Sequence, residues 1–204
     1  MTTESSSIIA ARPSPHSRHL SCAGFSMVEM LLVLGAMAIM FGAIYSGFEH
    51  LNRAYAAENV KAGTQQSARI GVEMMVQDLR LAGLNPLGTA GAGVVAATPT
   101  SFQFTADNTS DGDLEDPFEN ITYALNGTNL EQTNHLGTEV LLRNVSNLTF
   151  TYLDETGVTI PPAQLAVRLA DIRTVGITLT VSRPAGRNQE VSRTYSTQVR
   201  CRNL

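Results

Sequence analysis

Cysteine, tryptophan and histidine are scarce in this chain of 204 residues, which has two cysteines, no tryptophan and four histidines. The cysteines, Cys22 and Cys201, are too few for a disulfide-rich scaffold or a four-cysteine zinc site. The fold must therefore be stabilised by packing. The histidines are His16, His19, His50 and His135, and none of them forms a His/Cys ligand spacing.

Motifs that carry catalysis are also missing. The sequence contains no nucleophile-elbow pattern and no phosphate-binding loop. Its 14 Lys and Arg are outnumbered by 18 Asp and Glu, and the formal net charge of −4 argues against a broad basic surface for nucleic acid. We predict that the chain is not an enzyme, and we expect no catalytic residue, no cofactor and no nucleic-acid partner.

Two long stretches each lack one class of residue. Proline is absent from Phe25 through Asn85, so one long helix can run to about Leu84, where Gly83-Leu84-Asn85-Pro86 supplies stop signals. Charge is absent from Met30 to Phe48. As a helix this run would be roughly 28 Å long, close to the roughly 30 Å hydrocarbon core of a bilayer. The first half of the helix is therefore predicted to span a membrane.

A carboxylate lies just before this apolar run, in the motif Gly24-Phe25-Ser26-Met27-Val28-Glu29. A secretory signal has a shorter apolar region with small residues after it, whereas Ala23-Gly24 comes before the run. A Glu buried unpaired near the end of a spanning helix costs about 2–3 kcal/mol or more, so Glu29 is a functional hypothesis. If the chain were cut between Gly24 and Phe25, the new amine of one subunit could meet the Glu29 carboxylate of another.

This motif resembles the processing signal of the type IV prepilin family. The resemblance implies that a prepilin peptidase cuts after Gly24 and methylates the amine of Phe25, and that Glu29 acts in assembly. Residues 1–24 would be a leader whose basic side stays cytoplasmic. Residues 25–48 would be the membrane-spanning and assembly half of the helix, 49–85 its amphipathic half, and 86–204 a β-rich head outside the cytoplasm. An ordinary single-pass anchor or an uncleaved signal, with Glu29 snorkelling at the interface, is the alternative.

The predicted helix carries surfaces for more than one neighbour. Ala38, Gly42 and Ser46 recur every four residues and would let another helix approach closely, unless a membrane helix simply tolerates them. Beyond Phe48 we expect two apolar stripes, one packed on the chain's own sheet and the other on neighbouring subunits, with burial of both in one domain as the alternative. The first stripe comprises Val72, Met75, Val76 and Leu79, and the second comprises Ile70, Met74 and Leu81.

After Pro86, short alternating runs separated by turn residues predict β structure. Asn126-Gly127 is a two-residue hairpin signal, and a short helix is expected over 163–169. Strands follow one another with few helices between them, so the sheet should be mostly antiparallel and the fold class α+β. A long helix packed on such a sheet agrees with the ladle-shaped pilin fold. The expected strands are 93–97, 101–105, 120–125, 128–132, 139–142, 147–153, 174–182 and 191–199.

Three downstream segments, 77–86, 119–123 and 199–203, are similar to PilW-type minor pilins. This resemblance implies a minor pilin of a type IV pilus that primes or caps the filament. Its partners would be the lipid bilayer, the major pilin, other minor pilins and an inner-membrane assembly platform. A J-type pseudopilin of type II secretion and a membrane-anchored binding module that never polymerises are the alternatives. Cys201 alone would remain after processing, which departs from the cysteine pair of many pilins.

An acidic stretch of the head, Asp107 to Asp116, partly matches a calcium loop. Asp107, Asp111 and Asp113 fall at ligand positions. The bidentate position, however, holds Phe118, with Glu119 one residue late. A solvated acidic loop is the favoured interpretation, and calcium held by these residues is the alternative.

Overall fold

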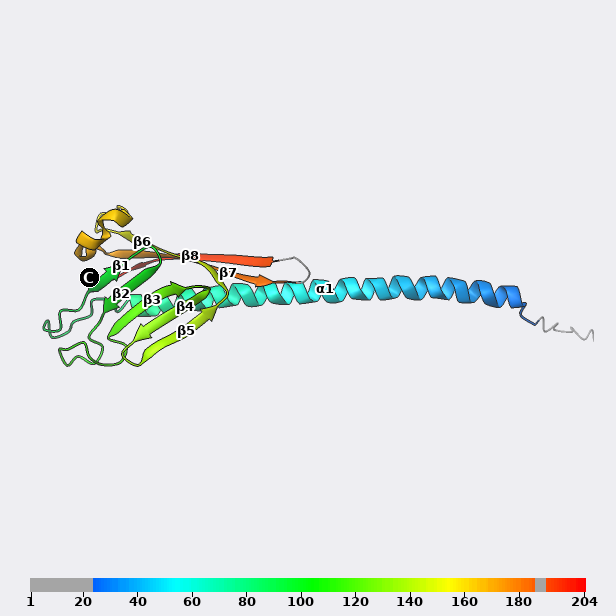
Figure 1. Ribbon diagram of the computed structural model, residues 1–204, viewed down its shortest axis with the longest axis horizontal. Coiled ribbons are helices and arrows are strands. Elements are labelled where there is room, and N and C mark those ends of the chain that lie inside the picture. The colour runs from blue at the N-terminus through cyan, green and yellow to red at the C-terminus, as the bar shows by residue number, and fades with distance from the viewer. Residues whose placement is uncertain (1–23, 186–189) are drawn as a thin grey trace, which may run out of the picture. The chain divides into compact units, whose positions relative to one another are not determined.

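The computed structural model describes residues 24–185 and 190–204 (Figure 1). The predicted leader apart from Gly24, and Cys22 with it, lies outside the described residues. The chain divides into two compact units, Met1–Phe48 and Glu49–Leu204. One helix, α1 (Met27–Leu79), contributes residues to both units.

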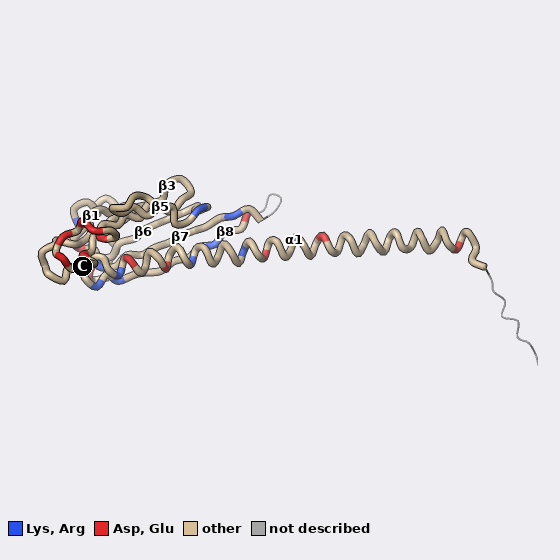
Figure 2. The backbone as a smooth tube through the Cα atoms, turned by 90° about the horizontal axis from the view of Figure 1, so that it is seen from below, with Lys and Arg blue, Asp and Glu red and all other residues tan. Residues whose placement is uncertain are grey.

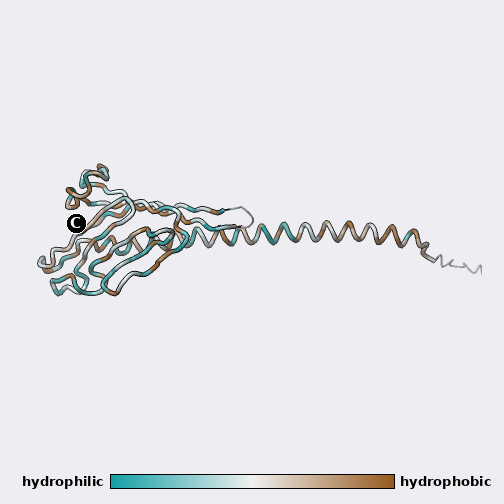
Figure 3. Tube along the Cα trace, viewed as in Figure 1, coloured by the Kyte–Doolittle hydropathy of each residue, from teal (hydrophilic) through white to brown (hydrophobic). Residues whose placement is uncertain are grey.

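In the first unit, α1 is apolar and uncovered. Glu29 is the acid of its first turn, and the next charged residue along the helix is Glu49, as Figure 2 shows. Every residue from Gly24 to Phe48 is exposed, including large side chains such as Leu31 and Phe41. Hydrophobic positions recur along this stretch in Figure 3, whereas hydrophilic ones recur beyond it. The helix is long and apolar enough to cross a membrane.

The helix ends at Leu79 rather than at Leu84, where the stop signals place its end. The chain tightens there into a turn in which the N–H of Ala82 donates to the carbonyl of Leu79 at 3.3 Å. Gly83 has a φ of 81°, a left-handed conformation that glycine adopts without strain. Its N–H donates to the carbonyl of Thr105 at 2.9 Å, so an acceptor outside the helix replaces the helical one.

The described residues of the second unit form two antiparallel sheets, with strand orders β1-β2-β3-β4-β5 and β6-β7-β8 (Figure 1). The antiparallel pairing is confirmed, but the expectation of a single sheet is wrong. Asn144, with a φ of 62°, lies between the last strand of one sheet and the first of the other. The strands are β1 (Val94–Ala97), β2 (Ser101–Thr105), β3 (Asn120–Asn126), β4 (Asn129–Asn134), β5 (Gly137–Arg143), β6 (Val145–Leu153), β7 (Thr174–Pro184) and β8 (Glu190–Arg200).

Each predicted strand is present, with ends that differ by at most two residues from those expected. The hairpin between β3 and β4 lies one residue later than predicted, because Asn126 pairs with Asn129 and the loop is Gly127-Thr128. Gly127 has a φ of 61°, which suits the first loop position of a two-residue hairpin. The expected short helix is present as two 3₁₀ segments, η1 (Pro162–Val167) and η2 (Leu169–Asp171).

One stripe of α1 packs into a hydrophobic core that it shares with both sheets. The first predicted stripe is buried in this core, as expected. The second stripe is 40–47% exposed, so the alternative that one domain buries both stripes is wrong. The buried residues are Val72, Met75 and Leu79, with Val76 partly buried, and the exposed ones are Ile70, Met74 and Leu81.

Four aromatic side chains join the two sheets inside this core. The ring of Phe102 in β2 lies 5.6 Å from that of Phe104, and 6.2 Å and 5.5 Å from those of Phe150 and Tyr152 in β6. The hydroxyl of Tyr152 donates to the carbonyl of Thr98 at 2.7 Å, which gives this buried polar group the partner it needs. Aromatic packing therefore contributes to the contact between the two sheets.

Candidate functional site

The start of α1 positions the residues of the predicted processing signal. The Oγ of Ser26 accepts a hydrogen bond from the N–H of Val28 at 3.4 Å, and its carbonyl accepts one from Met30 at 3.1 Å. Ser26 is therefore the N-cap, and Glu29 stands at the third helical position, the Ser-x-x-Glu arrangement of a capping box. The Ser-x-x-Glu spacing is visible in the sequence and is the signal from which the cap at Ser26 could have been predicted.

The carboxylate of Glu29 is exposed, and no ion pair involves it within residues 24–185 and 190–204. Its position in the first turn is favourable, because the N-terminal end of a helix carries partial positive charge. Glu29 thus stabilises the helix start and also presents an anion at the end of an apolar segment. The second property leaves it available to a cation from another molecule.

The predicted cleavage position is open. Gly24 and Phe25 are exposed, Phe25 to 78%, and both precede the first helical residue, Met27. A Cβ added at Gly24 would meet no atom within 4 Å. The described part of the chain therefore does not require glycine here, and any steric requirement for it comes from a molecule that binds at this bond.

The predicted seam of small residues is also uncovered. Ala38, Gly42 and Ser46 are exposed, and a Cβ added at Gly42 would meet no atom within 4 Å. Gly71, further along the same helix, is buried, and its added Cβ would lie 3.2 Å from side chains of both Leu142 and Leu179. The chain's own sheets thus fill the space at Gly71, whereas the space along the seam is left open.

The acidic loop brings together a set of carboxylates that differs from the predicted one. Asp107, Asp111 and Glu119 each have a carboxylate oxygen within 4.8 Å of the others. Asp113 is not in this group, and its Oδ1 accepts a hydrogen bond from the N–H of Glu115 at 3.0 Å. Two of the three predicted residues therefore meet, and Glu119, which the loop pattern places out of register, takes the place of the third.

Glu119 orders this loop through hydrogen bonds. It is buried, and its Oε1 accepts the N–H of Asn108 at 2.9 Å and both the N–H and the hydroxyl of Thr109 at 3.0 Å. Its Oε2 accepts the N–H of Asp116 at 3.3 Å. Burial acts to raise the pKa of Glu119, but these hydrogen bonds outweigh it and lower the pKa below its ordinary value. Protein donors thus already occupy both carboxylate oxygens of Glu119.

Outside the acidic loop, the carboxylate of Asp78 in α1 anchors the helix to the first sheet. It accepts hydrogen bonds from the hydroxyl of Tyr123 and, at 2.9 Å, from Nε2 of Gln132. Burial raises the pKa of Asp78, and the two hydrogen bonds offset this only in part. Sequence reasoning misses this contact, because the three residues lie on α1, β3 and β4.

No protein-family model and no curated protein matches this chain. Fold and site together define a protein with an apolar, capped N-terminal helix and an α+β head.

Proposed function

We propose that this chain is a minor pilin of a type IV pilus. A prepilin peptidase cuts it after Gly24 and methylates the amine of Phe25, and the subunit joins the filament through α1. The observation that carries this proposal is the uncovered apolar surface of α1 before Phe48, which begins beside an exposed Gly-Phe pair and has one acid, Glu29, in its first turn.

Apolar burial requires that the uncovered half of α1 stay covered throughout assembly. Fully burying a Leu, Ile, Phe or Met side chain contributes about 1.5–3 kcal/mol, and the uncovered half of α1 exposes many of them. Lipid covers these side chains in the membrane, and helices of other subunits cover them in the filament. Extraction from the membrane thus exchanges lipid contacts for protein contacts, and the seam of Ala38, Gly42 and Ser46 lets the helices approach closely.

Glu29 adds the specificity that apolar burial lacks. A carboxylate in an apolar environment is costly unless a positive charge pairs with it. In the uncut chain the nitrogen of Phe25 belongs to a peptide bond and cannot supply that charge. Cleavage frees it as an amine, so the pair between one subunit's amine and the neighbour's Glu29 can form only after processing.

The proposal also implies a location and partners. The subunit first resides in the inner membrane with its head outside the cytoplasm, and it then enters the filament. Its partners are prepilin peptidase, the assembly platform, the major pilin and other minor pilins. The exposed stripe of Ile70, Met74 and Leu81 supports a second contact with neighbouring subunits, because it is apolar and the chain itself leaves it uncovered.

Mass spectrometry of the native N-terminus, together with a filament-incorporation assay, tests the proposal. We expect the mature chain to begin at a methylated Phe25, and Glu29→Ala to abolish incorporation while the chain is still cut. Glu58→Ala is the matched control, because it removes an exposed acid of the same helix. An uncut chain that still enters filaments would overturn the proposal. A processed chain that depends on Glu29 but supports protein secretion instead of pili would be a J-type pseudopilin.

If Glu29→Ala leaves the function of the chain in the cell unchanged, the chain is a membrane-anchored binding module that does not polymerise.

A further inference from the structure

Three arginines of the head line one hollow of about 510 Å³. Arg173 follows η2, Arg200 is the last residue of β8, and Arg202 comes shortly after it. Glu155 is the one acidic side chain of the lining, so positive charge predominates here although the whole chain has a formal net charge of −4. The other lining residues are Cys201 and Leu204.

Strand pairing brings the three arginines together. Thr174 of β7 pairs with Arg200, and the N–H of Cys201 donates to the carbonyl of Arg173 at 2.9 Å. The side chain of Cys201 is buried, whereas its neighbours Arg200 and Arg202 are exposed. The two exposed arginines therefore lie beside Arg173 at the end of the second sheet.

Arg173 is held in place as a hydrogen-bond donor. It is half-buried, and its Nη1 donates to the carbonyls of Ala170 at 2.7 Å and Ile172 at 2.9 Å. Within the described ranges, its Nε and Nη2 donate to no protein group, and none of the three arginines has a carboxylate within 4.0 Å. A fixed guanidinium with free N–H groups suits a carboxylate or a phosphate, which it can bind through two parallel hydrogen bonds.

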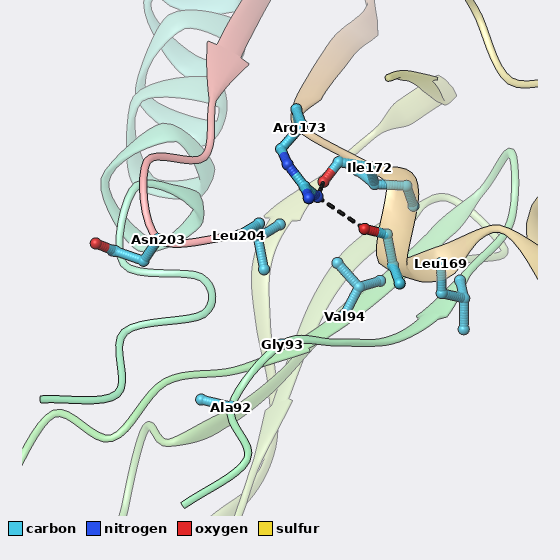
Figure 4. A pocket seen from close by; sticks show the side chains of 9 residues that line it. Ala92, Gly93, Val94, Leu169, Ile172, Arg173, Asn203 and Leu204 are labelled. Atoms are coloured by element: carbon cyan, nitrogen blue, oxygen red, sulfur yellow. Dashed lines mark hydrogen bonds between the residues drawn. The ribbon is translucent and has the colours of Figure 1, made fainter. Parts of the chain in front are cut away.

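A second, more apolar hollow of about 370 Å³ adjoins the first, because Arg173 and Leu204 line both. Figure 4 shows Arg173 and Leu204 on one side of it and Gly93 and Val94 on the other. Its remaining lining residues are Ala92, Leu169, Ala170, Ile172 and Asn203. A ligand whose anionic group contacts the arginines can therefore place an attached apolar group here.

We propose that the two hollows bind an amphipathic oxyanion, in which a carboxylate or phosphate contacts Arg173, Arg200 and Arg202 and a short alkyl group enters the adjoining hollow. The class of ligand follows from the lining: three arginines for the oxyanion, and aliphatic side chains for the alkyl group. The site is formed by the head alone and does not depend on the proposed role in filaments.

Calorimetric titration of the full chain in amphipol tests the site with hexyl phosphate, hexanoate and inorganic phosphate as probes. We expect hexyl phosphate to bind about tenfold more tightly than inorganic phosphate. The double variant Arg200→Gln/Arg202→Gln should weaken the binding of hexyl phosphate and of inorganic phosphate by about tenfold or more. Arg143→Gln/Arg193→Gln, which removes as many positive charges elsewhere on the head, should weaken neither. Ala170→Phe should remove the advantage of the hexyl chain and leave inorganic phosphate binding unchanged.

The outcomes separate the parts of the proposal. Absence of binding of all three probes at about 10 mM, or equal binding by wild type and the Arg200/Arg202 variant, would overturn it. Equal affinities for hexyl phosphate and inorganic phosphate would overturn the apolar part. Dihexanoyl phosphatidylglycerol, added as a fourth probe, tells a lipid headgroup from a free anion: tighter binding than hexyl phosphate supports a lipid source, and weaker binding supports a small soluble anion.

Discussion

The two halves of α1 have the same helical geometry but differ in what covers them. Up to Phe48 every described residue is exposed, and Glu29 is not paired with any described residue. Beyond Glu49 one stripe is buried, and Asp78 accepts two hydrogen bonds from the first sheet. The chain therefore covers one stripe of the second half of its helix by itself, whereas the first half needs lipid or other protein to cover it.

Substitution of one methionine in each half of α1 should give the largest difference in the free energy of unfolding. Met75 is fully buried, whereas Met37 is 47% exposed. Met75→Ala should lower the free energy of unfolding by about 2–5 kcal/mol, because it leaves a cavity in the core. Met37→Ala should change it by less than about 0.5 kcal/mol. Urea unfolding of the full chain in detergent, followed by circular dichroism, measures both. Equal losses would contradict the division of α1.

Substitution of one glycine in each half should give the next largest difference in the free energy of unfolding. Gly71→Leu should cost about 1–3 kcal/mol, because it overpacks the space beside Leu142 and Leu179. Gly42→Leu should leave unfolding in detergent unchanged, since an added Cβ meets no atom within 4 Å there. Under the proposed function, Gly42→Leu should instead reduce incorporation into filaments. A Gly42 variant that assembles normally would remove the seam from the proposed packing surface.

Asp78, the acid that anchors the second half of α1 to the first sheet, should make the stability of the fold depend on pH. Because the pKa of Asp78 is raised in the fold, its contribution to stability is full below the ordinary Asp pKa of about 3.9 and is lost as pH rises through the raised value. The stability of the wild-type chain should therefore decrease as pH rises through this range, and Asp78→Asn should abolish that decrease. Melting curves of the variant and of wild type between about pH 3 and pH 8 measure this, and identical profiles would contradict the expectation.

Added calcium should have the smallest effect on the stability of the chain. Protein donors already occupy the oxygens of Glu119, so we expect millimolar calcium to leave the melting temperature of the chain unchanged. A rise in melting temperature that Asp111→Ala abolishes would instead establish a cation site in the acidic loop. Asp113→Ala is the matched control, since Asp113 lies outside the carboxylate cluster.

Local signals in the sequence predict the helix and the strands of the fold, although α1 ends at Leu79 rather than at about Leu84. The absence of proline predicts the long helix, and alternation predicts every strand to within two residues. The spacing of Val72, Met75 and Leu79 predicts the buried stripe. Each of these signals depends on residues close together in the chain, where periodicity reports directly on which side is buried.

Contacts between distant segments could not be predicted in the same way. The division into two sheets, the contact of Asp78 with Tyr123 and the place of Glu119 among the carboxylates all depend on which segments become neighbours in three dimensions. Alternation in a strand indicates a buried face but does not identify the strand's partner. The roles of Gly24, Phe25 and Glu29 remain predictions, because they concern events between this chain and other molecules.

Under the proposed function, the cap formed by Ser26 has a consequence for maturation. Ser26 lies on the mature side of the Gly24–Phe25 bond, so removal of the leader leaves the first helical turn and its hydrogen bonds intact. The Gly24–Phe25 bond precedes the first helical residue, Met27, so the proposed cleavage would not unwind the helix. The conformational entropy of that turn would then be lost once, when the precursor folds, and a newly matured subunit would enter polymerisation with its first turn already ordered.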